Sequence, residues 1–152
     1  MLLYRRIIPA VNARCSFLLC TQATNLALLG QMYADVGEPE KGRQIIAGIP
    51  AAHRDGFFCA DILRAEGEII LRCDKSATRE AEARFQQALQ IAQARGEKSL
   101  ELRAATSLAR LWQGHGRREE AHRLLDGVYG WFTEGFDTAD LRVARALLQD
   151  LR

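Results

Sequence analysis

The chain of 152 residues is poor in the residues that interrupt helices. It contains only three prolines, while long stretches are rich in Ala, Leu, Arg, Glu and Gln, which favour helix. Hydrophobic residues make up 48% of the chain and charged residues 26%, the proportions of an ordinary globular protein rather than a disordered one. Length and composition therefore predict a single, largely helical domain over residues 1–152.

The net charge is small, and no strongly basic cluster is present. The formal charge is +2 and is spread along the chain, whereas nucleic-acid-binding proteins usually concentrate basic residues on one face. At the start of the chain, arginines, a proline and an asparagine interrupt every apolar run, unlike a signal peptide or a membrane span. We therefore expect no nucleic-acid partner, no membrane partner and a cytoplasmic location.

The residues that usually carry catalysis or bind metals lack the required spacing. No C-x-x-C pair occurs, so we expect reduced thiols that pack as small hydrophobic residues in a reducing cytoplasm: Cys15, Cys20, Cys59 and Cys73. We expect the three histidines to be solvent-exposed and not metal ligands: His53, His115 and His122. Gly116 breaks the helical register between His115 and His122, and no third ligand has suitable spacing. No serine stands in a G-x-S-x-G motif. The sequence predicts no metal, no cofactor and no enzymatic activity.

The stretch LRAATSLARLWQGHGRREEAHRLL, residues 102–125, contains two amphipathic helices separated by a short glycine-containing turn. Its first half repeats apolar residues at steps of three and four, which predicts one helical face: Ala105, Leu108, Ala109 and Trp112. The Gly-His-Gly turn then ends the helix. A second apolar face follows: Ala121, Leu124, Leu125 and Val128. Two short helices joined so closely must be antiparallel, and they need neighbours to cover their apolar faces.

The same layout occurs twice upstream. Small residues occupy matched positions in the first helix of each pair: Gly30, Gly67 and Ala109. A large residue follows three positions later: Tyr33, Ile70 and Trp112. The matched small residues are 37 and 42 positions apart, which is typical of an array of helical hairpins with connections of unequal length.

The order of residue types in these helix pairs resembles the tetratricopeptide repeat (TPR). In this pattern the first helix has a large residue, then Leu-Gly and then Tyr, and the second helix has Ala, an apolar residue and Ala. The resemblance implies an all-α, right-handed superhelix of antiparallel hairpins, in which the small residues let paired helices approach closely. Its units would span residues 23–56, 60–95 and 102–135, with a partial hairpin over 1–20 and a capping helix over 138–151. Gly42 departs from the pattern, because the second helix of a TPR usually has Ala at that position.

A second resemblance covers roughly the last two-thirds of the chain. The stretches KSLELRAATSLARLW and YGWFTEGFDTADL are similar to the C-terminal repeat tails of large bacterial signalling proteins. Those proteins combine adenylate/guanylate cyclase, protein-kinase or transcription-regulator domains with an ATPase module. This sequence lacks the phosphate-binding G-x-x-x-x-G-K-[ST] loop and the paired metal-binding aspartates of a cyclase, so the activities of those proteins are not expected here.

The last helix is expected to cover the exposed side of the final hairpin. Asp137 or Thr138 can cap its start, and its predicted inner face comprises Leu141, Ala144, Leu147, Leu148 and Leu151. The preceding connection holds three aromatic residues, which either pack under the last helix or form an exposed docking surface: Trp131, Phe132 and Phe136. Trp112 is predicted to lie between its own helix and the helix that carries Leu125.

The first helices of the pairs are expected to line a concave groove. The candidate peptide-binding site consists of residues on these helices that alternate with the packing residues and therefore face the groove: Gln31, Asp61, Arg64, Glu68, Arg103, Arg110 and Gln113. Arginine forms forked hydrogen bonds with carboxylates, so three arginines here favour a carboxylate-bearing peptide and a mildly basic groove. The alternative is a solvated helix face on which Asp61 and Glu68 pair with Arg64.

The sequence as a whole predicts a protein–protein interaction module, with a regulatory role in a bacterial signalling system and a peptide bound in the groove. The alternative is a self-association module that forms homodimers, or a structural remnant of a larger cyclase/ATPase signalling protein. The apolar residues near the start of the chain favour a homodimer through residues 1–30.

Overall fold

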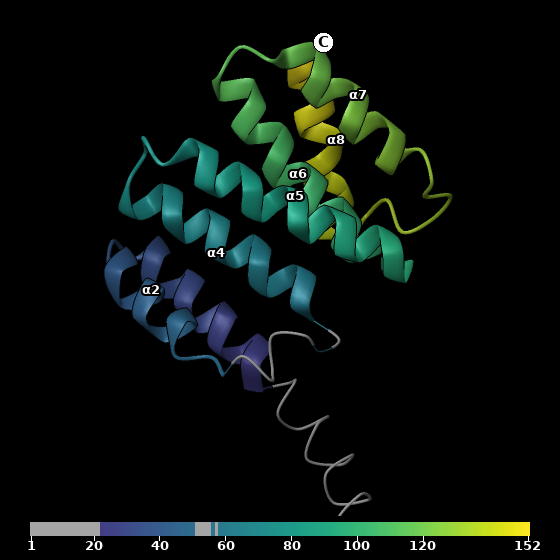
Figure 1. The fold of residues 1–152 in the computed structure, drawn as a ribbon. Helices are drawn as coiled ribbons and strands as arrows, with labels where there is room; N and C mark the ends of the chain where they lie inside the picture. Colours follow the sequence, from purple (N-terminus) through teal and green to yellow (C-terminus); the bar gives the residue numbers. More distant parts are fainter. Residues whose placement is uncertain (1–21, 51–55, 57) are drawn as a thin grey trace, which may run out of the picture.

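The computed structural model describes residues 22–50, 56 and 58–152, which form helices joined by turns, with no β-strand among them (Figure 1). The prediction of an all-α fold is therefore confirmed for this part of the chain. The partial hairpin expected over residues 1–20 lies outside the described residues, as do Cys15, Cys20 and His53.

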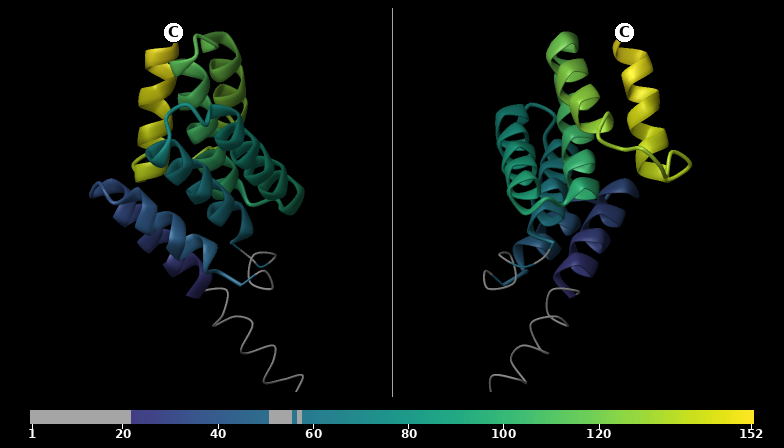
Figure 2. Two further views of the ribbon diagram at one scale, coloured as in Figure 1. Left: turned by 60° about the vertical axis from the view of Figure 1, so that its left-hand side comes forward. Right: turned by 90° about the vertical axis from the view of Figure 1, so that its right-hand side faces the viewer.

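A helix over residues 22–35 is followed by α2 (Pro39–Ala47), α4 (Cys59–Cys73), α5 (Thr78–Arg95), α6 (Lys98–Gly114), α7 (Arg118–Tyr129) and α8 (Ala139–Leu151). Helix α4 packs against α5, and α6 packs against α7. In addition, α4 contacts α6 and α6 contacts α8, so alternate helices lie side by side (Figure 2). The array therefore has one layer formed by residues 22–35, α4, α6 and α8. A second layer, formed by α2, α5 and α7, consists of helices that pack against the first layer and not against one another.

The turns after α5 and α6 have the same backbone arrangement. Gly96 and Gly116 have φ angles of 68° and 76°, a region that side-chain-bearing residues rarely adopt. After each glycine the next amide bonds back into the last helical turn, from Glu97 to the carbonyl of Ala92 and from Arg117 to that of Trp112, both at 2.9 Å. This arrangement satisfies carbonyl groups that the helix end would otherwise leave unpaired. The predicted helix end in the Gly-His-Gly turn is thus confirmed.

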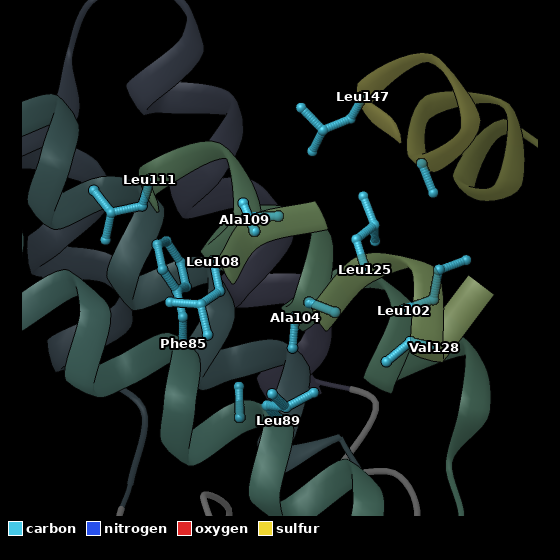
Figure 3. Close-up of a cluster of buried hydrophobic side chains, with 14 of the residues drawn as sticks. Phe85, Leu89, Leu102, Ala104, Leu108, Ala109, Leu111, Leu125, Val128 and Leu147 are labelled. Carbon is cyan, nitrogen blue, oxygen red and sulfur yellow. The ribbon is translucent and has the colours of Figure 1, made fainter. Parts of the chain in front are cut away.

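The main apolar core lies between α5, α6, α7 and α8 (Figure 3). Its largest fully buried side chains are Phe85, Leu102, Leu108 and Leu125. A smaller cluster joins residues 22–35 to α2 and α4, and on the first helix it is built only from alanines: Ala23, Ala27 and Ala34. In this smaller cluster the large side chains therefore come from outside the first helix, as isoleucines in and beside α2 and α4.

Glycines permit two close approaches within the pairs. A Cβ atom added to Gly42 would lie 2.3 Å from the carbonyl oxygen of Gly30, so α2 and the first helix touch backbone to backbone. An alanine at position 42, as in the repeat pattern, would not fit without moving the helices apart. The departure at Gly42 is thus explained by a contact in this chain. Gly67 has the same role beside Phe85 of α5.

Helix α8 has the predicted inner face, since all five predicted residues are buried: Leu141, Ala144, Leu147, Leu148 and Leu151. The predicted capping position is confirmed, but the side chain there does not cap the helix. Thr138 is the N-cap residue, but its side chain makes no capping hydrogen bond. Only its backbone carbonyl, 3.0 Å from the amide of Arg142, takes part in the first turn. The helix is therefore held mainly by apolar packing.

The aromatic side chains agree with the predictions only in part. Trp112 is only partly buried, and its indole N–H donates to Oε1 of Glu82 on α5 at 2.6 Å, so the predicted interior position against the Leu125 helix needs correction. Phe132 and Phe136 pack against the main core as expected, whereas Trp131 remains 58% exposed. A polar indole nitrogen with a carboxylate in reach explains why Trp112 lies at the core's edge.

The two described cysteines are both free thiols, as expected. Cys59 is buried, in agreement with the prediction, but Cys73 is exposed. Cys73 is the last residue of α4, where the helix reaches the turn to α5. The expectation of a buried thiol is therefore wrong for Cys73.

Candidate binding face

Two adjacent hollows lie on the layer formed by residues 22–35, α4, α6 and α8, which we term the first-helix face. The first, of about 210 Å³, lies between residues 22–35, α4 and α6. The second, of about 240 Å³, lies between α4, α6 and the start of α8. Five of the seven predicted residues line them: Gln31, Arg64, Glu68, Arg103 and Arg110. Three of these, Arg64, Glu68 and Arg110, border both hollows.

Arg64 is committed to partners within the protein. Its Nε lies 2.9 Å from Oδ1 of Asp61, one turn earlier on α4, and one terminal nitrogen donates to the side-chain oxygen of Gln31 at 3.2 Å. The side chains of Arg64 and Asp61 are only 15% and 17% exposed, so the pair is largely removed from water. Arg64 therefore links the first helix to α4, and its positive charge is balanced by Asp61 and not by a ligand.

Arg103 joins three helices. Its Nε donates to Oδ2 of Asp140 on α8 at 2.7 Å, and a terminal nitrogen lies 3.9 Å from Oδ2 of Asp61 on α4. Burial lowers the pKa of the Arg103 guanidinium, but the hydrogen bond to Asp140 and attraction to both carboxylates more than compensate and leave this pKa above its ordinary value. Arg103 is thus a positively charged link between α4, α6 and α8.

Glu68 has a different partner from the one expected. The alternative of a solvated face pairs both Asp61 and Glu68 with Arg64, but only Asp61 forms that ion pair. Glu68 instead accepts a hydrogen bond from the hydroxyl of Ser107 at 2.6 Å. Ser107 is 6% exposed, so this bond fixes the carboxylate at the edge of both hollows. One carboxylate of the face therefore has no cationic partner among the described residues.

Arg110 is the exposed arginine of this face without a partner. The structure gives it no ion pair and no side-chain hydrogen bond with any residue in ranges 22–50, 56 and 58–152. It stands three residues after Ser107 on α6, on the same side of the helix. The first-helix face thus presents an unpaired guanidinium and, across the same hollows, the carboxylate of Glu68.

Sequence reasoning missed part of the face and included one residue too many. Ser107 and Asp140 line the second hollow and bond to predicted residues. Ser107 follows Arg103 by four residues, so helical spacing alone could have included it. Asp140 could have been found only by treating the capping helix as a further first helix of the array and including its groove-facing residues. Asp61 and Gln113 border neither hollow, but Asp61 still belongs to the face through its ion pair with Arg64, whereas Gln113 does not.

The face is electrically balanced. The positive side chains Arg64, Arg103 and Arg110 are matched by the negative side chains Asp61, Glu68 and Asp140. The sequence predicted a mildly basic groove because Asp140 was not counted. The unpaired charges are therefore local features, one of each sign, and they do not form a broad basic field.

Other polar clusters do not form an alternative site. His115 is exposed, and its Nδ1 lies 2.7 Å from the carbonyl oxygen of Leu111. Glu101 is buried, but Lys98 and Gln93 bond to its carboxylate at 2.7 and 3.2 Å. Within the described ranges, no three His, Cys, Asp or Glu side chains come together as a metal site requires.

Comparisons of the chain with protein-family models, with curated proteins and with solved structures give no match. Among the helices that the structure describes, none combines the length and apolar character needed to cross a membrane. The function is therefore inferred from the geometry and charge of the first-helix face.

Proposed function

We propose that this protein is a non-catalytic, TPR-like interaction module of a bacterial signalling system, and that its first-helix face binds a peptide segment of another protein. The observation that carries the proposal is Arg110, which is exposed, unpaired and shared by two adjacent hollows. A guanidinium in this state is available for a forked pair of hydrogen bonds with a carboxylate.

The surroundings of Arg110 favour a peptide over a polyanion. Glu68 stands across the same hollows and would repel a run of phosphates, yet its carboxylate can accept hydrogen bonds from peptide N–H groups. Val143, which is exposed at the edge of the second hollow, adds an apolar contact. A segment with one carboxylate among apolar residues fits this combination.

The fixed pairs give the face its shape. Arg64 joins the first helix to α4, and Arg103 joins α6 to α8. A ligand that meets already ordered side chains loses less conformational entropy on binding. The helices of a repeat array supply such a surface, and an extended or helical segment can lie across them.

Affinity measurements on a partner recovered from the source cell test the proposal. With the partner's binding segment as a labelled peptide, Arg110→Ala should weaken binding by about 1.5–3 kcal/mol, the range for hydrogen bonds to charged groups. Arg110→Lys should restore only part of the loss, because an ammonium group does not form the forked pair. Raising the salt concentration should weaken binding only slightly, in contrast to polyanion binding.

The matched control is Arg79→Ala. Arg79 is also an exposed arginine without a partner among the described residues, but it lies on α5, in the other layer. Its removal should leave the affinity unchanged. Equal affinities of the wild type and a folded Arg110→Ala variant would overturn the proposal. Arg64→Ala and Arg103→Ala are less informative, because each also removes the closest ion-pair partner of a carboxylate on the same face, Asp61 and Asp140 respectively.

A further inference from the structure

The helix over residues 22–35 has its small and large apolar residues on unexpected sides. Its buried side holds the alanines of the smaller core, together with Gly30. Its large apolar residues are instead exposed: Leu26, Leu28, Leu29, Met32 and, just after the helix, Val36. A helix that is apolar on nearly every side is normally covered on every side.

The exposed residues form one stripe. Leu28, Met32 and Val36 follow each other at intervals of four, so they lie above one another, and they are 57%, 57% and 74% exposed. Leu26 and Leu29 widen the stripe along one edge and are 37% and 41% exposed. We term these five residues the outer stripe.

The outer stripe has no charge to repel a copy of itself. Asp35 is the single charged residue between positions 22 and 36, and it forms an ion pair with Arg72 of α4 at 2.9 Å. Two outer stripes brought together would therefore place apolar side chains against apolar side chains, with no like charges opposed.

No other surface of the described chain matches the outer stripe. Of the seven large hydrophobic residues exposed in the described ranges, five belong to the outer stripe, and the others are Trp131 and Val143. The opposite end of the array, α8, exposes Val143 among Arg142, Arg145 and Asp150. A head-to-tail contact would bury those charges, whereas a contact between two identical stripes would not.

We infer that the outer stripe binds a second copy of this chain, in a two-fold symmetric contact between the helices of residues 22–35. The stripe covers ten residue steps, about 15 Å along a helix at 1.5 Å per residue. A stripe of this length provides less area than the roughly 800 Å² per partner that a standard interface buries. The dimer is accordingly weak, with a dissociation constant on the order of 1–100 µM.

Sedimentation equilibrium of the full chain, at concentrations around this range, tests the contact. The wild type should show a reversible monomer–dimer equilibrium. Met32→Glu should shift it to monomer by at least about tenfold in dissociation constant, because two carboxylates would face each other across the axis. The control Trp131→Glu introduces the same charge at an exposed apolar position between α7 and α8, outside both hollows, and should leave the equilibrium unchanged.

A charge-swap experiment identifies the second copy as the occupant. Met32→Glu and Met32→Lys should each be monomeric alone, and mixing them should restore association as a heterodimer. Circular dichroism should show unchanged helix content in each variant. A wild type that stays monomeric throughout the range would overturn the inference. The occupant of the stripe would then be residues 1–21 of the same chain or another protein. Dimers that persist in Met32→Glu would also overturn the inference. Neither result depends on Arg110, so this inference and the proposed peptide site fail separately.

Discussion

The ring of Phe85 lies directly against the backbone of Gly67, and a Cβ atom added to Gly67 would stand 2.5 Å from Cε1 of that ring. Phe85 is fully buried among residues of α5, α6 and α7, so the ring has no free space into which it can move. The contact fixes the distance between α4 and α5, the most extensively packed pair among α2 and α4–α8.

Gly67→Ala should therefore destabilise the protein despite the higher helix propensity of alanine. Overpacking of a filled core costs about 1–3 kcal/mol, and the propensity gain offsets at most about 1 kcal/mol of it. We expect a net loss of about 1–2 kcal/mol in urea unfolding. Gly127→Ala is the control, because Gly127 lies within α7 with no atom within 4 Å of an added Cβ. It should stabilise by about 0.5–1 kcal/mol, and equal effects of the two substitutions would contradict the packing at Gly67.

Trp112→Ala should cost about 2–3 kcal/mol, less than the 3–5 kcal/mol typical of a fully buried tryptophan. The indole loses its hydrogen bond to Glu82 and its contact with Arg117, whose Cζ lies 4.3 Å from the ring centre. Trp131→Ala, at a residue that is 58% exposed, should cost less than about 1 kcal/mol. A Trp112→Ala loss as small as that of the control, measured by urea unfolding, would show that Trp112 does not join α5 to α6.

Leu147→Ala should destabilise the protein by about 2–5 kcal/mol, because α8 is part of the main core and Leu147 is 5% exposed. Val143→Ala, on the exposed side of the same helix, should change stability by less than about 1 kcal/mol. Thermal or urea unfolding of both variants gives the comparison. If both variants matched the wild type, α8 would be a loosely attached segment and not a structural cap.

The carboxyl of Asp74, in the turn between α4 and α5, should titrate below its ordinary pKa. The hydroxyl and then the amide of Ser76 donate to it at 2.7 and 2.8 Å and lower its pKa. A lowered folded-state pKa stabilises the protein above the unfolded-state pKa, and this stabilisation disappears as the pH falls through the folded-state pKa. Ser76→Ala should raise the Asp74 pKa part of the way back, as measured by carbon NMR titration. Ser99→Ala, at an exposed serine of α6, should leave it unchanged.

The sequence by itself determined the local structure. Apolar spacing predicted helices and their inner faces, as in the five buried residues of α8. Glycine at position 116 predicted the end of α6, because few other residues adopt its backbone angles. The same periodicity selected Arg64, Arg103 and Arg110 for one face, and the structure brings all three to the two hollows. These features depend on residues within one or two helical turns of each other, so they can be read from spacing.

Only the tertiary structure decided which of those side chains are paired. Arg103 bonds to Asp140, 37 residues away, and Arg64 to Gln31, 33 residues away, whereas Arg110 has no partner among the described residues. The exposure of the outer stripe was equally hidden, because leucines spaced along a helix do not show which side its neighbours cover. Helical periodicity fixes the direction of a side chain relative to its own helix axis. The angles and distances between helices then determine what that side chain meets.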